Sequence, residues 1–394
     1  MSLDNARVVG NRVAYQRRMA RLTQEQLAAA AGIHVGTLRK IERGARGAGD
    51  GVLEALASAL GIDVLRLHGD ADKATRRVHH ELAAISDALA TYDCPDDGPV
   101  RPVPELRKAS AHTVEWRLSA QYLRIARQAP VLLAELFRGM HTARGAHLAV
   151  STHLLVDVCR SADAVAYKHG AANLSARLIE IMRWATPHAE DPLLAATVAY
   201  VRAETFFMSR AYAAGLGVLE SAIDSLPVAT GPSAHAARGA LHMRAAVMAG
   251  RAGRADVATE HMASAHRMAD GVPEGIYRGT AFGPDSVRVH DVSLCVSLGG
   301  HHLLRALDIS RHWEPPETLP AERRSGFFIE LARAQLWAGK PDAAFASLLT
   351  ARRIAPQHTR EHRWVREDAG TLRRLKRSSA ESLSGFAEWC HATG

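Results

Sequence analysis

The fold of the N-terminal part of the chain is decided by one stretch, Thr23-Gln24-Glu25-Gln26-Leu27-Ala28-Ala29-Ala30-Ala31-Gly32-Ile33-His34, and by the segment Val35-Gly36-Thr37-Leu38-Arg39-Lys40-Ile41-Glu42-Arg43 that follows it. Thr23 suits the N-cap of a helix, because its hydroxyl can accept a hydrogen bond from the first turn. Gly32 suits the left-handed turn that ends a helix, and Ala28 is small enough for two helices to cross closely. Leu38 and Ile41 lie three residues apart, so they would anchor a second helix in a core. The stretch therefore predicts two short helices joined by a tight turn.

Helical spacing of apolar residues extends on both sides of this stretch. The pattern predicts five short helices, at residues 8–19, 24–31, 35–43, 51–60 and 64–67. One face of each helix is apolar and can be buried against the others. We therefore expect a compact five-helix domain within residues 1–70.

These residues resemble the phage-repressor-like (XRE) helix-turn-helix family, whose pattern is Ser/Thr-Gln-x-x-Leu-Ala-x-x-x-Gly, a recognition helix and then Ile-Glu-x-Gly. The resemblance covers residues 8–67, and it rests on Thr23-Gln24, Leu27-Ala28, Gly32, Thr37-Leu38 and Ile41-Glu42-Arg43-Gly44. It implies that the second helix of the pair enters the major groove of DNA. An ordinary helical hairpin is the alternative that the residues leave open.

The resemblance assigns the DNA contacts residue by residue. Val35, Gly36 and Lys40 occupy the base-facing places, and the arginines of the same helix would contact phosphates. Valine and glycine cannot form bidentate hydrogen bonds to a base, so specificity would come from Val35 against thymine methyl groups, from Lys40 or Arg39, and from DNA shape. His34 would either contact a phosphate or cap the helix. The predicted DNA-binding residues are Gln24, His34, Val35, Gly36, Thr37, Arg39, Lys40 and Arg43.

A polar helix at about 72–90 follows this domain, and a proline-rich segment comes after it. Four prolines lie between Pro95 and Pro104, where they remove hydrogen-bond donors and prevent a helix. We therefore expect a helix and linker at 71–104 that could let the flanking parts reorient. The predicted domains are a helix-turn-helix domain at 1–70, this linker, and a helical-repeat domain for sensing and dimerisation at 105–394.

Beyond residue 105, small residues recur at the spacing of a two-helix repeat. From Ala332, the residues 12, 19 and 24 places on are Ala344, Ala351 and Pro356; from Ala203 they are Gly215, Ala222 and Pro227. Sets that start at Ala246 and Asp163 are more degenerate. The layout resembles the tetratricopeptide repeat, two antiparallel helices of about 34 residues that stack into a superhelix. We therefore expect an all-α chain with a tetratricopeptide-like α-solenoid, and an irregular helical bundle is the alternative.

The repeat resemblance also implies which residues line the concave groove. Positions three before, and one, four and five after, the first small residue of each repeat face that groove. Aromatic walls with a few charges suit a small amphipathic or anionic ligand. Peptide receptors hold peptide backbones with asparagines, but only Asn173 of the three asparagines lies in the array, so a small molecule or a partner protein is at least as plausible an effector as a peptide. The predicted effector-binding residues are Arg160, Tyr167, Lys168, Tyr200, Glu204, Phe207, Arg333 and Trp337.

Composition narrows the function classes. The net charge of +8 is compatible with contact to a polyanion. The four cysteines are far apart, so neither a zinc site nor a disulfide framework is indicated, and a reducing cytoplasm fits. No signal peptide, membrane span, catalytic motif or cofactor motif is recognisable. We expect no enzyme activity, no metal, no cofactor and no membrane partner.

Together these observations predict a cytoplasmic transcriptional regulator that binds double-stranded DNA sequence-specifically. The combination resembles regulators of high-GC bacteria and, more distantly, peptide-pheromone receptors. By that resemblance the chain would be a homodimer on a palindromic operator, with a small-molecule or peptide effector in the helical repeats modulating DNA binding. The alternative is a protein-interaction scaffold whose helix-turn-helix domain does not bind DNA.

Overall fold

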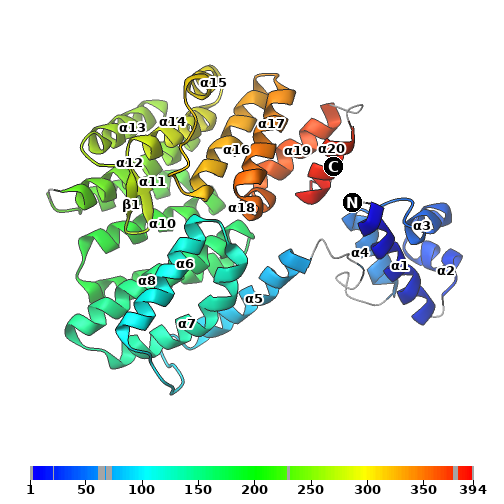
Figure 1. Cartoon of the computed structure of the whole chain (residues 1–394), viewed down its shortest axis with the longest axis horizontal. Coiled ribbons are helices and arrows are strands. Elements are labelled where there is room, and N and C mark those ends of the chain that lie inside the picture. Colours follow the sequence, from blue (N-terminus) through cyan, green and yellow to red (C-terminus); the bar gives the residue numbers. More distant parts are fainter. Residues whose placement is uncertain are drawn as a thin grey trace. The chain divides into compact units, whose positions relative to one another are not determined.

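Helices form nearly all of the regular structure of the chain (Figure 1). The computed structural model describes residues 3–20, 22–60, 67, 73–228, 231–375 and 380–392. These residues belong to two units, one of Met1–Arg77 with Val365–Gly394 and one of Val78–Trp364. The expected all-α class with helices packed in pairs is confirmed, and one short hairpin is the exception. None of the described helices combines the length and hydrophobicity that crossing a bilayer requires.

Four helices begin the first unit, and they agree with the predicted positions to within a few residues. They are α1 (Leu3–Met19), α2 (Gln24–Ala30), α3 (Val35–Glu42) and α4 (Asp50–Leu60). Their apolar faces form one core that contains Val13, Leu27, Leu38, Ile41 and Leu56, all at most 1% exposed. The fifth predicted helix, at 64–67, lies outside the described residues except for Leu67, which is buried.

The second unit begins within α5 (Lys73–Ala90) and continues through the proline-rich segment. That segment is extended, and the chain next turns helical at α6 (Val103–Leu118). The residues that the sequence assigned to a linker therefore lie largely inside the second unit. Arg101 holds the segment to α7 (Tyr122–Thr142) through ion-pair hydrogen bonds to Glu135.

Antiparallel helix pairs follow one another along the second unit (Figure 1). The pairs are α8 (Gly145–Lys168) with α9 (Ala172–Ala185), α10 (Pro192–Ser209) with α11 (Tyr212–Asp224), α12 (Pro232–Arg251) with α13 (Ala255–Ala269), α14 (Pro284–Leu298) with α15 (His302–His312), and α16 (Ala321–Trp337) with α17 (Pro341–Ile354). A 3-10 turn at Thr186–Ala189 follows α9, and α18 (Pro356–Glu361) follows α17. The C-terminal helices are α19 (Arg363–Leu375) and α20 (Ala380–Trp389).

The small residues of the predicted repeat lie where paired helices cross. Ala332 on α16 and Ala344 and Ala351 on α17 are at most 1% exposed. Gly215 on α11 has no room for a side chain, because a Cβ there would lie 2.7 Å from Cβ of Phe206 on α10. Small residues at these offsets therefore allow the close approach that the repeat requires.

A β-hairpin that the sequence analysis did not predict lies between α13 and α14. Strands β1 (Gly275–Tyr277) and β2 (Thr280–Phe282) are antiparallel, with Gly275 opposite Phe282. The two turn residues, Arg278 and Gly279, both have left-handed backbones, with φ of 48° and 69°. A two-residue turn of this kind matches the twist of paired strands. The turn brings two backbone carbonyls towards the interior of the array.

Candidate functional site

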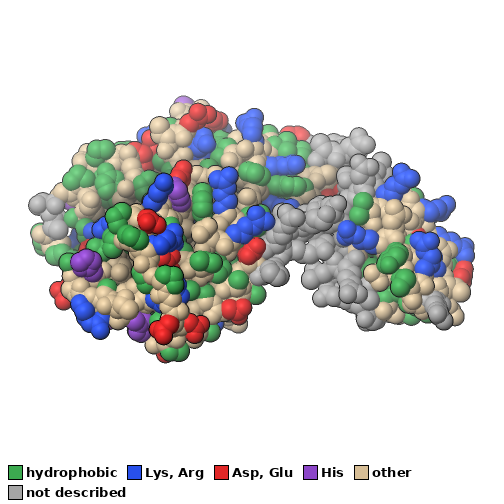
Figure 2. Space-filling model, turned by 60° about the horizontal axis from the view of Figure 1, so that its bottom comes forward, with side chains coloured by type: hydrophobic (Ala, Val, Ile, Leu, Met, Phe, Trp, Pro, Cys, Tyr) green, Lys and Arg blue, Asp and Glu red, His purple; other side chains and the backbone are tan. Residues whose placement is uncertain are grey.

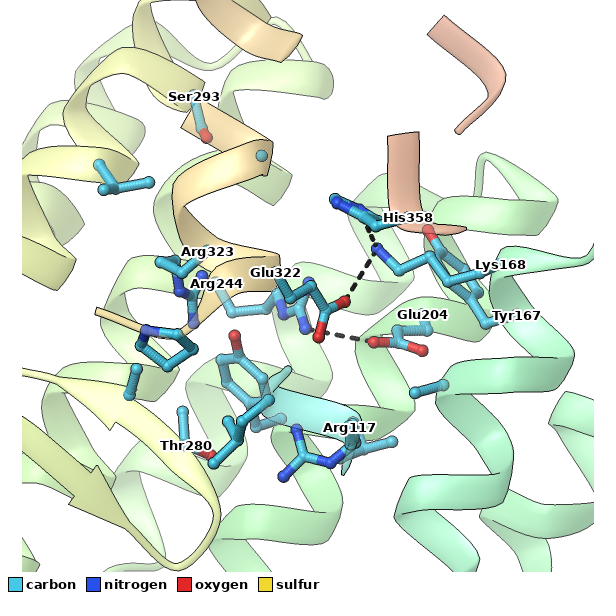
Figure 3. A pocket seen from close by; sticks show the side chains of 18 of the residues that line it. Arg117, Tyr167, Lys168, Glu204, Arg244, Thr280, Ser293, Glu322, Arg323 and His358 are labelled. Atoms are coloured by element: carbon cyan, nitrogen blue, oxygen red, sulfur yellow. Dashed lines mark hydrogen bonds and ion pairs between the residues drawn. The ribbon is translucent and has the colours of Figure 1, made fainter. Parts of the chain in front are cut away.

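A cavity of about 250 Å³ lies within the second unit. Its walls come from α6, α8, α10, α12, α14 and α16, from the hairpin, and from residues near α18. Figure 3 shows Arg117, Arg244 and Arg323 around this hollow, with Lys168, Glu322 and His358 on another side of it. Helices that are distant in sequence therefore bring a dense set of charged and aromatic side chains together.

Two buried arginines hold the hairpin turn at one end of the cavity. Nη2 of Arg117 donates to the carbonyl of Gly279 at 2.6 Å, and Nη1 of Arg160 donates to the carbonyl of Arg278 at 2.8 Å. Nη2 of Arg160 also donates to Oγ1 of Thr280 at 2.8 Å. Burial lowers the pKa of Arg160 to about 9, and the charge of Arg117 adds to this effect.

Tyr200 lies among the arginines of the cavity. The guanidinium of Arg244 stacks 4.1 Å from the Tyr200 ring centroid, and that of Arg160 lies 5.8 Å from it. Burial raises the pKa of Tyr200, but the charges of Arg244, Arg323 and Arg160 outweigh burial and lower this pKa to about 8. The site therefore favours negative charge at this position.

Lys168 forms the opposite side of the cavity with two polar partners. Its Nζ lies 3.2 Å from Oε1 of Glu322 and 3.0 Å from Nε2 of His358. Burial raises the pKa of Glu322, but the Lys168 charge and further cations outweigh it and hold this pKa below its usual value. Lys168 is therefore already neutralised by a carboxylate.

The outer wall of the cavity continues as a stack of alternating cations and rings. Arg251 lies 4.7 Å from the Phe207 ring centroid and 5.2 Å from that of Trp364. Arg333 lies 4.3 Å from the Trp364 centroid and 5.5 Å from that of Trp337. Cation–π contacts therefore connect the cavity wall to Trp337, which is 54% exposed.

In the first unit, caps define where α2 and α3 begin. Thr23 and Gln26 form a reciprocal capping box: the Gln26 amide donates to Oγ1 of Thr23 at 3.1 Å, and the Thr23 amide donates to Oε1 of Gln26 at 2.8 Å. The Gly36 amide donates to Nδ1 of His34 at 3.0 Å. Because Nδ1 accepts this bond, it carries no proton, and His34 is a helix cap in this structure.

Basic side chains lie on the outer face of α3. Arg39, Lys40 and Arg43 are exposed, whereas Leu38 and Ile41 are buried. Arg39 is held by α2, since its Nη2 lies 2.5 Å from Oε1 of Glu25. Val35, Gly36 and Thr37 are partly exposed at the start of the helix. Figure 2 shows basic side chains gathered on the visible face of this unit.

This geometry agrees with a comparison of sequences, in which the helix-turn-helix family model matches residues 13–67. The N-terminal unit contains a helix-turn-helix domain. The match confirms the predicted phage-repressor-like resemblance and indicates that this domain is of a DNA-binding kind. No curated protein has a significant sequence match to the chain.

A comparison of structures finds two solved chains, both at low sequence identity and low TM-score. PlcR from Bacillus thuringiensis, in complex with the peptide PapR7 and DNA, is 16% identical, with 67% of this chain and 95% of that chain covered and a TM-score of 0.30. A mutant of PrgX is 8% identical, with 96% and 99% covered and a TM-score of 0.26.

The structure brings most of the predicted effector residues together. Six of the eight line the cavity, namely Arg160, Tyr167, Lys168, Tyr200, Glu204 and Phe207. Arg333 and Trp337 do not line it and instead belong to the cation–ring stack beyond Phe207. The predicted DNA-binding residues lie on α2, on α3 and at the ends of α3 in the helix-turn-helix domain.

Several cavity residues were missed by the sequence analysis. Arg117 and Arg323 lie outside the repeat offsets that were applied, so no sequence signal identified them. Val247 and Arg251 could have been found, because they stand one and five places after Ala246, the small residue of a degenerate repeat. Among the described residues, no three His, Cys, Asp or Glu side chains are placed to hold a metal ion.

Proposed function

We propose that the protein is a sequence-specific transcriptional regulator that binds a palindromic operator as a homodimer, with an effector in the cavity modulating DNA binding. The arrangement of α3 is the observation that carries the DNA-binding part. Leu38 and Ile41 fix the helix in the core, so Lys40 and the two arginines face outward on one exposed surface. A helix held in this way can enter a major groove and keep its register.

Individual roles follow from the environment of each side chain. Lys40 is exposed and can reach a base edge or a phosphate. Gln24 donates to Oε2 of Glu42 at 2.6 Å and accepts from Arg39 at 3.3 Å, so it sets the position of Arg39. Arg39 would exchange Glu25 for a phosphate on binding DNA. Specificity would rest on Val35, on Lys40 and on DNA shape, because Gly36 offers no side chain.

The test of this function is capture of genomic fragments with the purified full-length protein, followed by sequencing. One recurring palindrome with half-sites about one helical turn apart would support a homodimer, because the symmetry of the site mirrors that of the protein. One module of this kind covers only roughly 600–1,000 Å², which is little for stable specific binding by a single copy. An asymmetric single half-site, bound by a monomer, would contradict the dimer.

A double variant, Arg39→Ala with Lys40→Ala, tests which helix contacts DNA. We expect weaker binding and a flatter dependence on salt, since each lost phosphate contact removes about 0.9 from the log–log slope. Arg183→Ala is a matched control, because Arg183 is an exposed arginine on α9 that pairs only with Glu180 on the same helix. An unchanged slope in a folded double variant would favour the scaffold alternative.

The cavity supports the effector part of the proposal. Its volume of about 250 Å³ is below the range of roughly 300–1,000 Å³ that drug-sized ligands occupy, so a small molecule fits better than a peptide. Such a ligand changes DNA affinity only if it prefers one arrangement of the dimer. Protein isolated from its producing cells should carry a small molecule that is lost in the Tyr200→Ala variant. A molecule bound equally by folded Tyr200→Ala and Phe207→Ala variants would place the effector elsewhere.

A further inference from the structure

Three arginines of the cavity lack a carboxylate partner. Among the residues that the structure describes, no carboxylate forms an ion pair with Arg117, Arg160 or Arg323. Arg117 and Arg160 donate only to hairpin carbonyls and a hydroxyl, and Nη1 of Arg323 lies 3.2 Å from Nε2 of His290. Arg117 and Arg160 are 7% and 6% exposed. Buried cations with neutral partners are costly, which an anion in the cavity would relieve.

Buried arginine N–H groups without a hydrogen-bond partner also indicate that the cavity binds an anion. Nε of Arg117 and Nε of Arg244 are buried and form no hydrogen bond in the described structure. Buried polar atoms normally form hydrogen bonds, so these two unpaired nitrogens indicate a hydrogen-bond acceptor that the protein itself does not supply. Arg244 has a carboxylate near it, but Oε1 of Glu204 is 3.5 Å from its Nη2.

The cavity also has an excess of positive charge. Six arginine or lysine side chains line it against four carboxylates. Glu322 is already paired with Lys168, and Asp163 accepts a hydrogen bond from Ser175 at 2.5 Å. Burial and the charge of Glu204 raise the pKa of Asp163 well above its usual value, so Asp163 offers little negative charge. Arg117 and Arg160, the arginines at the hairpin, therefore have carboxylates in their surroundings but no direct ion pair among the described residues.

Planar groups, namely guanidinium groups and aromatic rings, form the cavity wall next to these arginines. Arg244 lies between two rings, 4.1 Å from the Tyr200 centroid and 5.7 Å from the Phe207 centroid, and Arg251 covers Phe207 at 4.7 Å. Guanidinium groups and aromatic rings stack on planar molecules. The small volume leaves room for one such ring system and no long chain.

We propose that the cavity binds a small planar organic oxyanion, an aromatic or conjugated body bearing a carboxylate or phosphate, whose oxygens contact Arg117, Arg160 and Arg323. The body lies against Tyr200, Phe207 and the plane of Arg244. The hairpin turn positions Arg117 and Arg160 for this contact by holding their other donors. The proposal rests on the effector pocket of the proposed function and names its ligand class.

The experiment measures binding to the full-length protein without DNA. The probes are benzoate, naphthoate and phenyl phosphate, with benzamide, naphthamide and inorganic phosphate as comparisons, and the readout is the melting temperature. We expect the organic anions to raise the melting temperature in a concentration-dependent way and the amides to leave it unchanged. Whichever of carboxylate or phosphate gives the larger shift identifies the head group.

A second readout uses Tyr200 itself. Its pKa of about 8 makes its phenol ionise early, so phenolate absorbance against pH reports on the cavity. An anion among Arg160, Arg244 and Arg323 disfavours the phenolate and moves the pKa of Tyr200 back towards its ordinary value of about 10. Tyr200→Phe removes this absorbance step and so assigns it. This readout does not depend on a large change in stability.

Variants separate the anion contact from general packing. Arg117→Met, Arg160→Met and Arg323→Met should each weaken naphthoate binding about tenfold or more, as expected for a lost charged hydrogen bond. Arg323 is only partly buried and does not hold the hairpin, so its variant should fold even if the other two do not. Arg117→Lys should recover part of the binding, and Arg183→Met should bind as the natural protein does.

The following results would each contradict a different part of the oxyanion proposal. Naphthamide binding as tightly as naphthoate would overturn the oxyanion, and a full effect from inorganic phosphate alone would overturn the planar body. No change in melting temperature or in the Tyr200 titration with any anion would overturn the proposal. Binding of naphthoate without any effect on DNA affinity would support the ligand class and count against the regulatory role.

Discussion

Arg101 clamps the proline-rich segment to α7 through Glu135. Nη2 and Nε of Arg101 lie 2.6 and 2.9 Å from Oε2 of Glu135, and the Arg101 amide donates to Oε1 at 2.7 Å. Burial raises the pKa of Glu135, but its hydrogen bonds with Arg101 outweigh burial and lower it. Prolines prevent a helix here, and the Arg101–Glu135 ion pair holds the extended segment against α7.

Replacing Glu135 by alanine should release this segment. Charged hydrogen bonds of this kind contribute about 1.5–3 kcal/mol, so exchange of the Arg101 amide with deuterium should accelerate about tenfold or more. Glu115→Ala on α6 removes an exposed glutamate and should change nothing. Unaltered exchange of the Arg101 amide in a folded Glu135→Ala variant would mean that other contacts hold the segment.

Glu42 joins three parts of the helix-turn-helix domain. It receives hydrogen bonds from Nε and Nη2 of Arg17 on α1, at 2.6 and 3.0 Å, and from Gln24 on α2. Glu42→Ala should therefore destabilise this domain by about 1.5–3 kcal/mol, because three donor groups on two residues lose their acceptor. Hydrogen exchange of the Leu38 and Ile41 amides measures this opening free energy in the full chain.

The control for Glu42 is Glu25, whose partner Arg39 is itself half exposed. Exposed ion pairs contribute little, so Glu25→Ala should leave the same amide exchange rates unchanged. Equal effects of the two variants would show that burial does not decide the strength of these pairs.

Two glycines in helix interiors test the position of the hairpin. A Cβ on Gly239 of α12 would lie 2.1 Å from Cζ of Phe282, a buried residue of β2, whereas Gly217 of α11 has no atom within 4 Å. Gly239→Ala should cost about 1–3 kcal/mol by overpacking. Gly217→Ala should stabilise the array by about 0.5–1 kcal/mol through helix propensity. Denaturant unfolding measures both, and stabilisation by Gly239→Ala would contradict the hairpin position.

The helix-turn-helix domain was predictable because its determinants are local. Thr23, Gly32 and the spacing of Leu38 and Ile41 specify caps, a turn and a buried face within twenty residues. The concave residues of the array were predictable for a similar reason. A repeat gives equivalent positions equivalent surroundings, so Arg160 and Tyr200 could be placed from their offsets.

The rest of the cavity depends on contacts between distant parts of the chain. Arg117 meets the carbonyl of Gly279, 162 residues later, and no local pattern encodes that meeting. The hairpin strands have three residues each, which is too short for alternation to be recognised. The dipeptide Arg278-Gly279 was the available signal, since glycine favours a left-handed turn.

A buried histidine should make the stability of the array depend on pH. Nε2 of His358 accepts from Lys168, and Nδ1 lies 2.7 Å from Oγ of Ser325, which itself donates to the carbonyl of Glu322 at 3.0 Å. Serine can donate one proton only, so Nδ1 of His358 carries the proton and the ring is neutral. Burial and the nearby charge of Lys168 lower the pKa of His358 well below its usual value.

The direction of the effect follows from this lowered pKa. The pKa of His358 is lower in the folded chain than in the unfolded chain. At pH values between the two, His358 is protonated in the unfolded chain but not in the folded chain. The full contribution of His358 to folding stability is therefore present above about pH 6.5 and is lost as the pH falls. One such histidine contributes at most about 1.4 kcal/mol per pH unit, and His290 and His362, whose pKa values are also lowered by burial, add to the slope. The Lys168–Glu322 pair weakens only at lower pH, because the pKa of Glu322 lies below its usual value of 4.5.

Urea unfolding followed by tryptophan fluorescence measures this slope mainly in the array, since five of the six tryptophans lie in the second unit and only Trp389 lies in the first. His358→Gln should be less stable than the natural protein at neutral pH and should lose less stability on acidification. His147→Gln, at an exposed position on α8, should keep the natural slope. If unfolding free energy depends on pH with the same slope in His358→Gln, His147→Gln and the natural protein, His358 is not the group whose protonation accompanies unfolding.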